Sequence, residues 1–246
     1  MLNSLTDELQ VERNGSIVTL WMNRPEVSNA LNRSLQKAII ETLKEIDKDE
    51  SITCVVLRGR GNVFSSGQDG TETKGMGGEE ARIWISEIEE LYDSIRNLSK
   101  VSIAAVEGMA AAASLQIAML CDLRIVTSST KLQMQELKMG IPCIAGTSLL
   151  IPMIGEARAR QLVFEAKPIS AETALSWGLV GTVATEDKFE ETLNEMCTNV
   201  NTLGPLSVKV TKAWFRELSE TNFRKALQKS GDLHSDVFAS GEAYSL

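Results

Sequence analysis

The sequence has little of what several large classes of protein require. Its 246 residues include four cysteines, none in a CxxC pair, and a single histidine, His234. A disulfide framework and a structural zinc site are therefore excluded, and no Ser-His or Cys-His catalytic pair is predicted. The glycine fingerprint of a dinucleotide site is absent as well. We expect reduced thiols in a cytosolic protein that holds no metal and no dinucleotide cofactor.

Basic residues and long apolar runs are also scarce. Lys and Arg number 25 against 33 Asp and Glu, for a net charge of −8. This balance argues against nucleic acid or an anionic membrane as a partner, because both need a basic footprint. No apolar run approaches the roughly 18 residues of a membrane span, and residues 1–10 do not have the pattern of a signal peptide. We therefore expect a soluble, cytoplasmic protein.

The most informative segment is 101–147, which places a strand, a turn of small residues, a helix and one acid close together. Backbone N–H groups at a helix N-terminus lack partners and favour negative charge, and the alanines at 110–113 leave room for a ligand to reach them. Glu136 lies in an apolar run between Leu132 and Met139, so burial is expected to raise its pKa. The segment predicts an anion-binding pocket that faces one proton carrier.

The rest of the chain alternates predicted strands and helices. Asn14-Gly15 predicts a hairpin between strands at 9–13 and 16–22, and apolar spacing predicts a helix over 35–46. Further strands are expected at 53–59, 101–106 and 122–127, and helices over about 84–98, 112–120, 156–164 and, in two or three pieces, 187–240. The glycine-rich segment 60–80 is predicted to be a mobile loop or a lid. The pattern indicates an α/β fold that ends in a helical region.

Six motifs are similar in order and spacing to those of one family. They are NRPEVSNALN at 23–32, VVLRGRGNVFSSGQD at 55–69, VSIAAVEGMA at 101–110, LQIAMLCDLRI at 115–125, GTSLLIPMIGEARARQLVF at 146–164 and ISAETALSWGLV at 169–180. Over nearly its whole length the chain resembles the crotonase family, the enoyl-CoA hydratase/isomerase group. The resemblance implies a spiral of ββα units with a CoA-thioester site over 1–190 and a helical trimerisation region over 191–246. It also implies a homotrimer or hexamer, with coenzyme A present as part of the substrate and no other cofactor.

The same resemblance implies which residues form the site. In the F-x-x-G-x-D motif at 64–69, the residue after Gly67 supplies the first oxyanion donor, here the N–H of Gln68, and Asp69 caps or braces the loop. The second donor is the N–H of Ala113, next to Ala112. Two such donors aimed at an oxygen that becomes an enolate stabilise it by about 3–4 kcal/mol each.

The chain departs from the hydratase pattern at one of two glutamates. Gln116 stands where the first is expected, and Glu136 matches the second. Glutamine cannot exchange a proton at neutral pH, so one-base chemistry is favoured. Isomerisation of an enoyl-CoA needs only one carboxylate, and hydration is the next candidate. Decarboxylation or carbon–carbon bond formation on a carboxyacyl-CoA is a further alternative, because MQELKMGIPCIAG at 134–146 is similar to carboxymethylproline synthases.

Other departures concern binding. Ala112, Ala113 and Ser114 occupy positions where glycines are usual, and each Cβ disfavours a positive φ. Ser28 replaces a basic residue, so contact with the phosphates of coenzyme A is expected to depend on Arg24, on a lysine at 74 or on a neighbouring subunit. Pro142 is expected to lie beside the acyl chain, and Glu72, Glu79 and Glu80 are candidates for a second acid. These departures leave open a member of the family that binds without catalysis.

Overall fold

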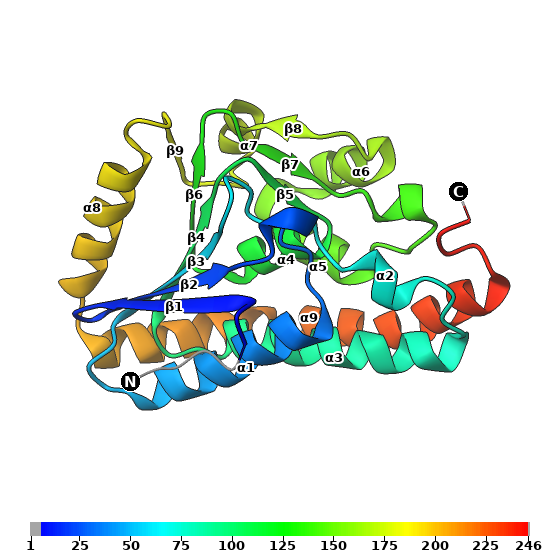
Figure 1. Cartoon of the computed structure of the whole chain (residues 1–246), viewed down its shortest axis with the longest axis horizontal. Helices are drawn as coiled ribbons and strands as arrows, with labels where there is room; N and C mark the ends of the chain where they lie inside the picture. The colour runs from blue at the N-terminus through cyan, green and yellow to red at the C-terminus, as the bar shows by residue number, and fades with distance from the viewer. Residues whose placement is uncertain (1–5, 246) are drawn as a thin grey trace.

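The computed structural model describes residues 6–245 and builds two sheets surrounded by helices (Figure 1). The larger sheet has the strand order β1-β2-β3-β4-β6-β9, and its neighbouring strands are parallel except for the hairpin β1–β2. Its strands are β1 (Leu9–Asn14), β2 (Ile17–Met22), β3 (Cys54–Gly59), β4 (Val101–Val106), β6 (Leu123–Thr127) and β9 (Thr182–Ala184). Every residue of β3 and β4 is buried, as expected for central parallel strands that are covered on both faces.

A smaller sheet contains three short strands, β5 (Met109–Ala111), β7 (Lys131–Gln133) and β8 (Ile169–Ser170). After β4 the chain forms β5 and then helix α4 (Ala113–Leu120), and after β6 it forms β7 and then α5 (Ile144–Ile154). Successive turns of the chain therefore place one strand in each sheet before a helix, which confirms the predicted α/β spiral of ββα units. The sequence does not predict the short strands, because two or three residues are too few to show a period.

The segment 60–80 is not the free loop that its composition predicts. The N–H of Phe64 donates to the carbonyl of Glu107 at 2.9 Å, and that of Ser65 donates to Met109 at 3.1 Å. A short helix, α2 (Gly70–Thr73), follows, and α3 (Gly78–Arg96) begins inside the segment. Pairing with backbone from a distant part of the chain fixes this segment, and composition carries no sign of that pairing.

Two long antiparallel helices, α3 and α9 (Pro205–Ser240), lie side by side along the bottom of Figure 1, next to α1 (Arg33–Lys48). Ion pairs join them, between Arg96 and Glu220 and between Arg224 and Asp93, the latter at 2.6 Å. With 36 residues, α9 is about 54 Å long. The remaining helices are α6 (Glu156–Glu165), α7 (Ala171–Trp177), α8 (Phe189–Asn201) and the 3₁₀ helices η1 (Pro25–Val27) and η2 (Glu136–Met139).

The first half of α9 leaves an apolar face uncovered. Its large side chains are each more than half exposed, and their spacing places them on one side of the helix. They are Leu206, Val210, Trp214, Phe215 and Leu218, which we call the α9 apolar face. This face lies within the predicted trimerisation region, and trimerisation stays a prediction. None of the helices in the described part of the chain is long and apolar enough to cross a membrane.

Candidate active site

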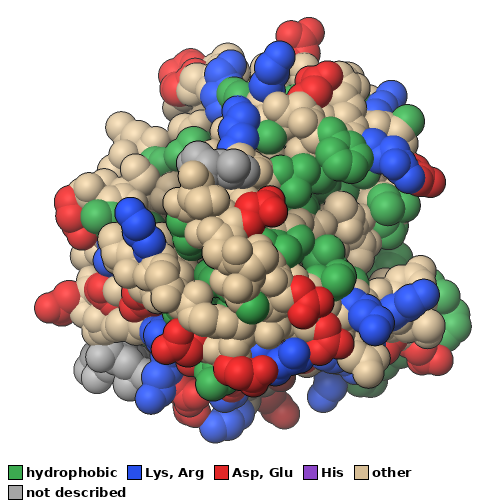
Figure 2. Space-filling model, turned by 90° about the vertical axis from the view of Figure 1, so that its right-hand side faces the viewer, with side chains coloured by type: hydrophobic (Ala, Val, Ile, Leu, Met, Phe, Trp, Pro, Cys, Tyr) green, Lys and Arg blue, Asp and Glu red, His purple; other side chains and the backbone are tan. Residues whose placement is uncertain are grey.

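A cavity of about 220 Å³ lies between α3, α9, η2 and the start of α4. Figure 2 shows the end of the molecule where α2 and the C-terminal tail lie, and there hydrophobic side chains gather in the middle of the face with charged ones around them. Six of the nine predicted site residues line the cavity, namely Gln68, Ala112, Ala113, Gln116, Glu136 and Pro142. The structure thus brings together residues that are up to 74 positions apart in the chain, from 68 to 142.

Two backbone amides at the cavity have no acceptor. Neither the N–H of Gln68 nor that of Ala113 donates a hydrogen bond to any residue within 6–245. The two segments touch, because a Cβ added to Gly67 would lie 3.4 Å from the nitrogen of Ala113. Leu31 holds the peptides on both sides of Gln68, accepting from the N–H of Asp69 at 3.1 Å and donating to the carbonyl of Gly67 at 2.8 Å. Two orphan donors fixed in adjacent segments can bind an anionic oxygen.

Ala112 turns the chain from β5 into α4. Its φ of 49° and ψ of −124° lie in a region that residues with a Cβ rarely adopt. The N–H of Ala112 donates to the carbonyl of Gln133 at 2.9 Å, and the hydroxyl of Ser114 donates to the carbonyl of Ser65 at 2.6 Å. These contacts hold the turn that leaves the next amide, that of Ala113, free. A Cβ disfavours a positive φ, and within the run 112–114 only Ala112 adopts one. The conformational cost predicted for this run is therefore located at Ala112.

The Glu136 carboxylate is buried at the first residue of η2, with the residue 6% exposed. The side-chain amide of Gln116 donates from Nε2 to Oε1 of Glu136 at 2.8 Å, and the thiol of Cys143 lies close enough to influence the pKa of this carboxylate. Oε2 has no hydrogen-bond partner among the residues described. Burial raises the pKa of Glu136 above the usual range of a carboxyl group, and its own backbone N–H, Gln116 and Cys143 offset only part of that effect.

A buried tyrosine fixes the orientation of Gln116. The hydroxyl of Tyr92, on α3, donates to Oε1 of Gln116 at 3.0 Å, so Nε2 of the same amide points to Glu136. Packing leaves no spare room around these groups. A Cβ at Gly146 would lie 2.7 Å from Sγ of Cys143 and 3.3 Å from Cδ of Gln116. The geometry therefore presents one carboxylate, held by neutral donors, to the same cavity as the two free amides.

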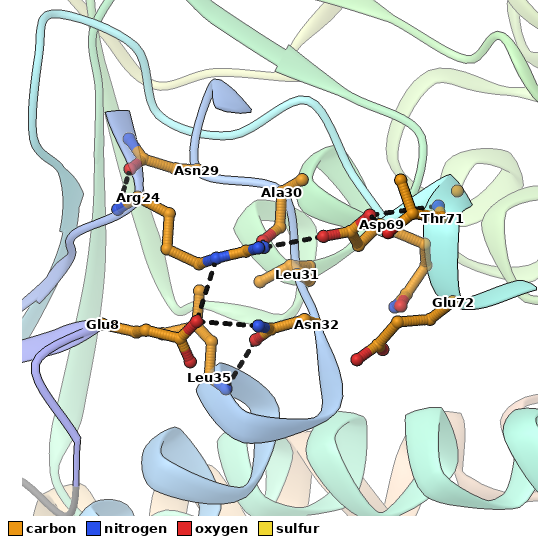
Figure 3. Close-up of polar contacts among 12 residues, drawn as sticks. Glu8, Arg24, Asn29, Ala30, Leu31, Asn32, Leu35, Asp69, Thr71 and Glu72 are labelled. Atoms are coloured by element: carbon orange, nitrogen blue, oxygen red, sulfur yellow. Dashed lines mark hydrogen bonds and ion pairs between the residues drawn. The ribbon is translucent and has the colours of Figure 1, made fainter. Parts of the chain in front are cut away.

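The loop before α2 is braced by the buried network drawn in Figure 3. The guanidinium of Arg24 donates to Oδ2 of Asp69 at 2.9 Å, to the carbonyl of Ala30 at 2.5 Å and, through Nε, to Glu8 at 3.1 Å. The other oxygen of Asp69 accepts from the N–H and hydroxyl of Thr71, at 3.1 and 2.6 Å, and so caps α2. Asp69 therefore caps α2 and braces the loop, and its contact with substrate stays a prediction.

Arg24, Gly67 and Asp69 are the predicted site residues that do not line the cavity. Gly67 adopts a φ of +102° behind Gln68, where its missing Cβ makes room for the carbonyl of Ala111. The side chain of Arg24 is 15% exposed and is engaged by two carboxylates. Contact between Arg24 and coenzyme A stays a prediction, and these ion pairs disfavour it.

A family model described as enoyl-CoA hydratase/isomerase matches residues 12–244. The chain belongs to this family. Among its curated relatives, the short-chain-enoyl-CoA hydratase of Clostridium acetobutylicum is 31% identical over 232 residues, which cover 94% of this chain and 89% of the relative. The 2,3-dehydroadipyl-CoA hydratase of Escherichia coli is 27% identical and covers 96% and 92%.

The same fold is found among solved structures of this family. The crystal structure of an enoyl-CoA hydratase from Mycobacterium avium subsp. paratuberculosis matches with a TM-score of 0.87 and 25% identity. The match covers 98% of this chain and 99% of the other. A crotonase-type fold is therefore shown over the whole chain, and it encloses the cavity described above.

Among the residues of the cavity wall that sequence reasoning missed, four have titratable side chains. Glu89 and Tyr92 come from α3, His234 from α9 and Tyr244 from the C-terminal tail. Nδ1 of His234 contacts the carbonyl of Ser230 at 2.7 Å. The two α3 residues carry a usable signal, since each interrupts an otherwise apolar stripe on a helix.

None of the acids proposed from the loop, Glu72, Glu79 and Glu80, lines the cavity. Glu72 accepts from the N–H of Arg33 at 2.9 Å, and Glu80 accepts from that of Gly77 at 2.8 Å at the start of α3. The second carboxylate at the cavity is instead Glu89, whose pKa is raised by partial burial and by nearby Asp93.

Proposed function

We propose that this protein isomerises an enoyl-CoA thioester by a one-base mechanism. The observation that carries the proposal is the single buried Glu136 carboxylate, bound by the amide of Gln116 and placed at the same cavity as the free amides of Gln68 and Ala113. A double-bond shift requires one group that removes a proton from one carbon and returns it to another. It also requires stabilisation of the enolate formed between these two steps.

In the proposed reaction the carbonyl oxygen of the thioester accepts hydrogen bonds from the N–H groups of Gln68 and Ala113. Glu136 removes a proton from the α carbon of a 3-enoyl-CoA, and the electron pair delocalises onto the oxygen. Loss of one such donor costs about 2.7–4 kcal/mol in comparable oxyanion sites. The protonated Glu136 then returns the proton to the γ carbon, which gives the 2-enoyl-CoA. No net oxidation occurs, so the coenzyme A of the substrate is the only coenzyme required.

The raised pKa of Glu136 suits this role. A base whose pKa lies closer to neutrality removes a carbon acid's proton more effectively, and its conjugate acid still returns that proton. The Gln116 amide holds the carboxylate and cannot take its proton, and burial raises the pKa of the neighbouring Cys143 thiol well above its usual range. The unpartnered Oε2 is the atom proposed to carry the proton.

Hydration of a 2-enoyl-CoA is the second candidate, and the names of the relatives favour it. Hydration requires a water held for attack and a group that assists it. In this chain the Gln116 amide is engaged by Tyr92 on one side and Glu136 on the other, which favours isomerisation.

Proton exchange tests the proposal directly. A 3-enoyl-CoA is incubated with the protein in deuterated water, and deuterium at the α and γ carbons is followed by mass spectrometry. In a separate assay, hydration of crotonyl-CoA is measured by the loss of its absorbance. Glu136→Gln is expected to abolish exchange. The matched control is Glu89→Gln, which removes the other carboxylate at the cavity and is expected to retain exchange. Exchange that persists in Glu136→Gln would refute the assignment, and hydration without isomerisation would favour the second candidate.

We further propose that the active form is a self-assembled trimer or hexamer formed through the α9 apolar face. Five neighbouring large apolar side chains that are more than half exposed form a patch that a protein without a partner rarely leaves open to water. A second copy of this chain is the expected occupant, since the patch lies in the region that the resemblance predicts to trimerise.

A further inference from the structure

The C-terminal tail after α9 returns to the cavity. Gly241 ends α9 with a φ of +78°, and residues 242–245 then lie beside α2, at the right of Figure 1. Ala243 and Tyr244 pack against the main hydrophobic core, and the Tyr244 ring meets that of Phe238 edge-on at 6.3 Å. Tyr244 also lines the cavity itself. The tail is therefore part of the wall of the site.

On one side, Tyr244 contacts the segment that follows the Gln68 amide. Its hydroxyl forms a hydrogen bond with the hydroxyl of Thr73, the last residue of α2. Its ring lies 3.5 Å from the position that a Cβ would occupy on Gly70, the first residue of α2. Since Asp69 caps this helix, a displacement of α2 would move the peptide that carries the Gln68 amide.

On the other side, the tail contacts the segment that carries Glu136. The N–H of Tyr244 donates to the carbonyl of Met139, the last residue of η2, at 2.7 Å. A Cβ on the next residue, Gly140, would lie 2.5 Å from the carbonyl of Glu242. The tail thus fills space left by the missing side chain of Gly140 and makes an ordinary van der Waals contact at Gly70, so it touches both segments that form the site.

The backbone at Tyr244 is held in an uncommon conformation. Its φ is +61°, in the left-handed region that bulky residues rarely adopt. Such a conformation persists when surrounding contacts determine it, and it is concentrated at functional sites. Here the contacts are the hydroxyl of Thr73, the carbonyl of Met139 and the ring of Phe238.

We propose that Tyr244 is a positioning and specificity-determining residue of this site. Through Thr73 and Met139 it fixes the oxyanion loop relative to the segment of Glu136, and its ring limits the length of the acyl group that the cavity accepts. The inference rests on the proposed function for the identity of the ligand, an acyl-CoA. The positioning part is a property of the free protein and is testable without a ligand.

The first experiment compares backbone amide exchange in the free protein for Tyr244→Phe, Thr73→Val and the double variant. Loss of either hydroxyl is expected to accelerate exchange in residues 68–74 and 137–140, and the double variant is expected to add nothing, because the two hydroxyls form one contact. The matched control is Ser245→Ala, which removes a neighbouring hydroxyl that bonds within the tail to the Glu242 carbonyl at 2.6 Å. Unchanged exchange in Tyr244→Phe would overturn the positioning role.

The second experiment measures the affinity of saturated acyl-CoAs, from butyryl to dodecanoyl, by calorimetry. Tyr244→Ala is expected to raise the affinity for longer chains relative to butyryl-CoA by about tenfold, the value of one to two extra buried methylenes. Tyr244→Phe keeps the ring, so it is expected to keep the original preference while lowering kcat for a 3-enoyl-CoA with little change in KM. An unaltered preference in Tyr244→Ala would overturn the specificity role. Absence of binding to every acyl-CoA would refute the proposed function, and amide exchange would then decide the inference alone.

Discussion

Replacing Ala112 by glycine should release energy stored in the turn before α4. With a φ of 49° and a ψ of −124°, an alanine costs about 1–3 kcal/mol that glycine avoids. Glycine also costs about 0.5–1 kcal/mol in chain entropy, and the lost methyl, in a residue 4% exposed, contributes about 0.8 kcal/mol. The free energy of unfolding is therefore expected to change by only about −1 to +2 kcal/mol, whereas most substitutions in a core lower it.

The matched control is Ala113→Gly. Ala113 is 5% exposed and begins α4 without a positive φ, so the same substitution removes a similar methyl but relieves no strain. It is expected to lower the free energy of unfolding by about 1–2 kcal/mol. The two variants differ by the strain of about 1–3 kcal/mol, and 1 kcal/mol corresponds to about 2–4 °C in a chain of this size, so their Tm values should differ by about 2–12 °C.

Thermal unfolding followed by circular dichroism measures this difference. Both variants are compared at the same protomer concentration, because self-association makes Tm depend on concentration. A fall in Tm for Ala112→Gly that equals the fall for Ala113→Gly would refute the reasoning, since it would mean that the positive φ stores no energy.

Three further predictions concern the carboxylate, its packing and the exposed helix face. Burial raises the pKa of Glu136 in the folded chain, so its unfavourable ionisation reduces stability as the pH rises above the usual carboxyl pKa of 4.5; the Tm of Glu136→Gln minus that of the natural chain should therefore grow with pH from there until the raised pKa is passed, and a constant difference would contradict this. Gly146→Ala should lower the free energy of unfolding by about 1–3 kcal/mol and slow proton exchange, because the added methyl would lie 2.3 Å from Cε of Met134 and 2.7 Å from Sγ of Cys143; unchanged Tm and exchange would show that the pocket adapts. Phe215→Asp should reduce the mass found by analytical ultracentrifugation to that of a monomer while the equally exposed Phe164→Asp leaves it unchanged, and an intact assembly in Phe215→Asp would exclude this face.

Much of the fold is predictable because it follows from local patterns. The alternation of buried strands and amphipathic helices identifies the larger sheet, and Asn14-Gly15 identifies its antiparallel edge. The short strands at 109–111 and 131–133 are not predictable in this way. They form because each pairs with the other across more than 20 residues, and that pairing leaves no periodic mark in three residues.

The residues of the candidate site also fall into a group that the sequence predicts and a group that it does not. Glu136 and Gln116 lie in one continuous segment whose motifs place them, and a buried carboxylate beside a neutral amide is what those motifs predict. Tyr92 and Tyr244 belong to helices and a tail whose sequences carry no motif for this chemistry. Their roles depend on tertiary contacts between residues that are distant in the sequence. Tyr92 and Gln116 are 24 positions apart, and Tyr244 and Thr73 are 171 positions apart.

The unbroken length of α9 links two parts of the protein that are otherwise separate. Its first half carries the α9 apolar face, and its second half supplies Leu227, Ser230 and His234 to the cavity wall. If copies of the chain assemble through the first half, dissociation would release one end of a helix whose other end lines the site. Specific activity should then fall when the protein is diluted below the dissociation constant of the assembly, and recover when it is concentrated again.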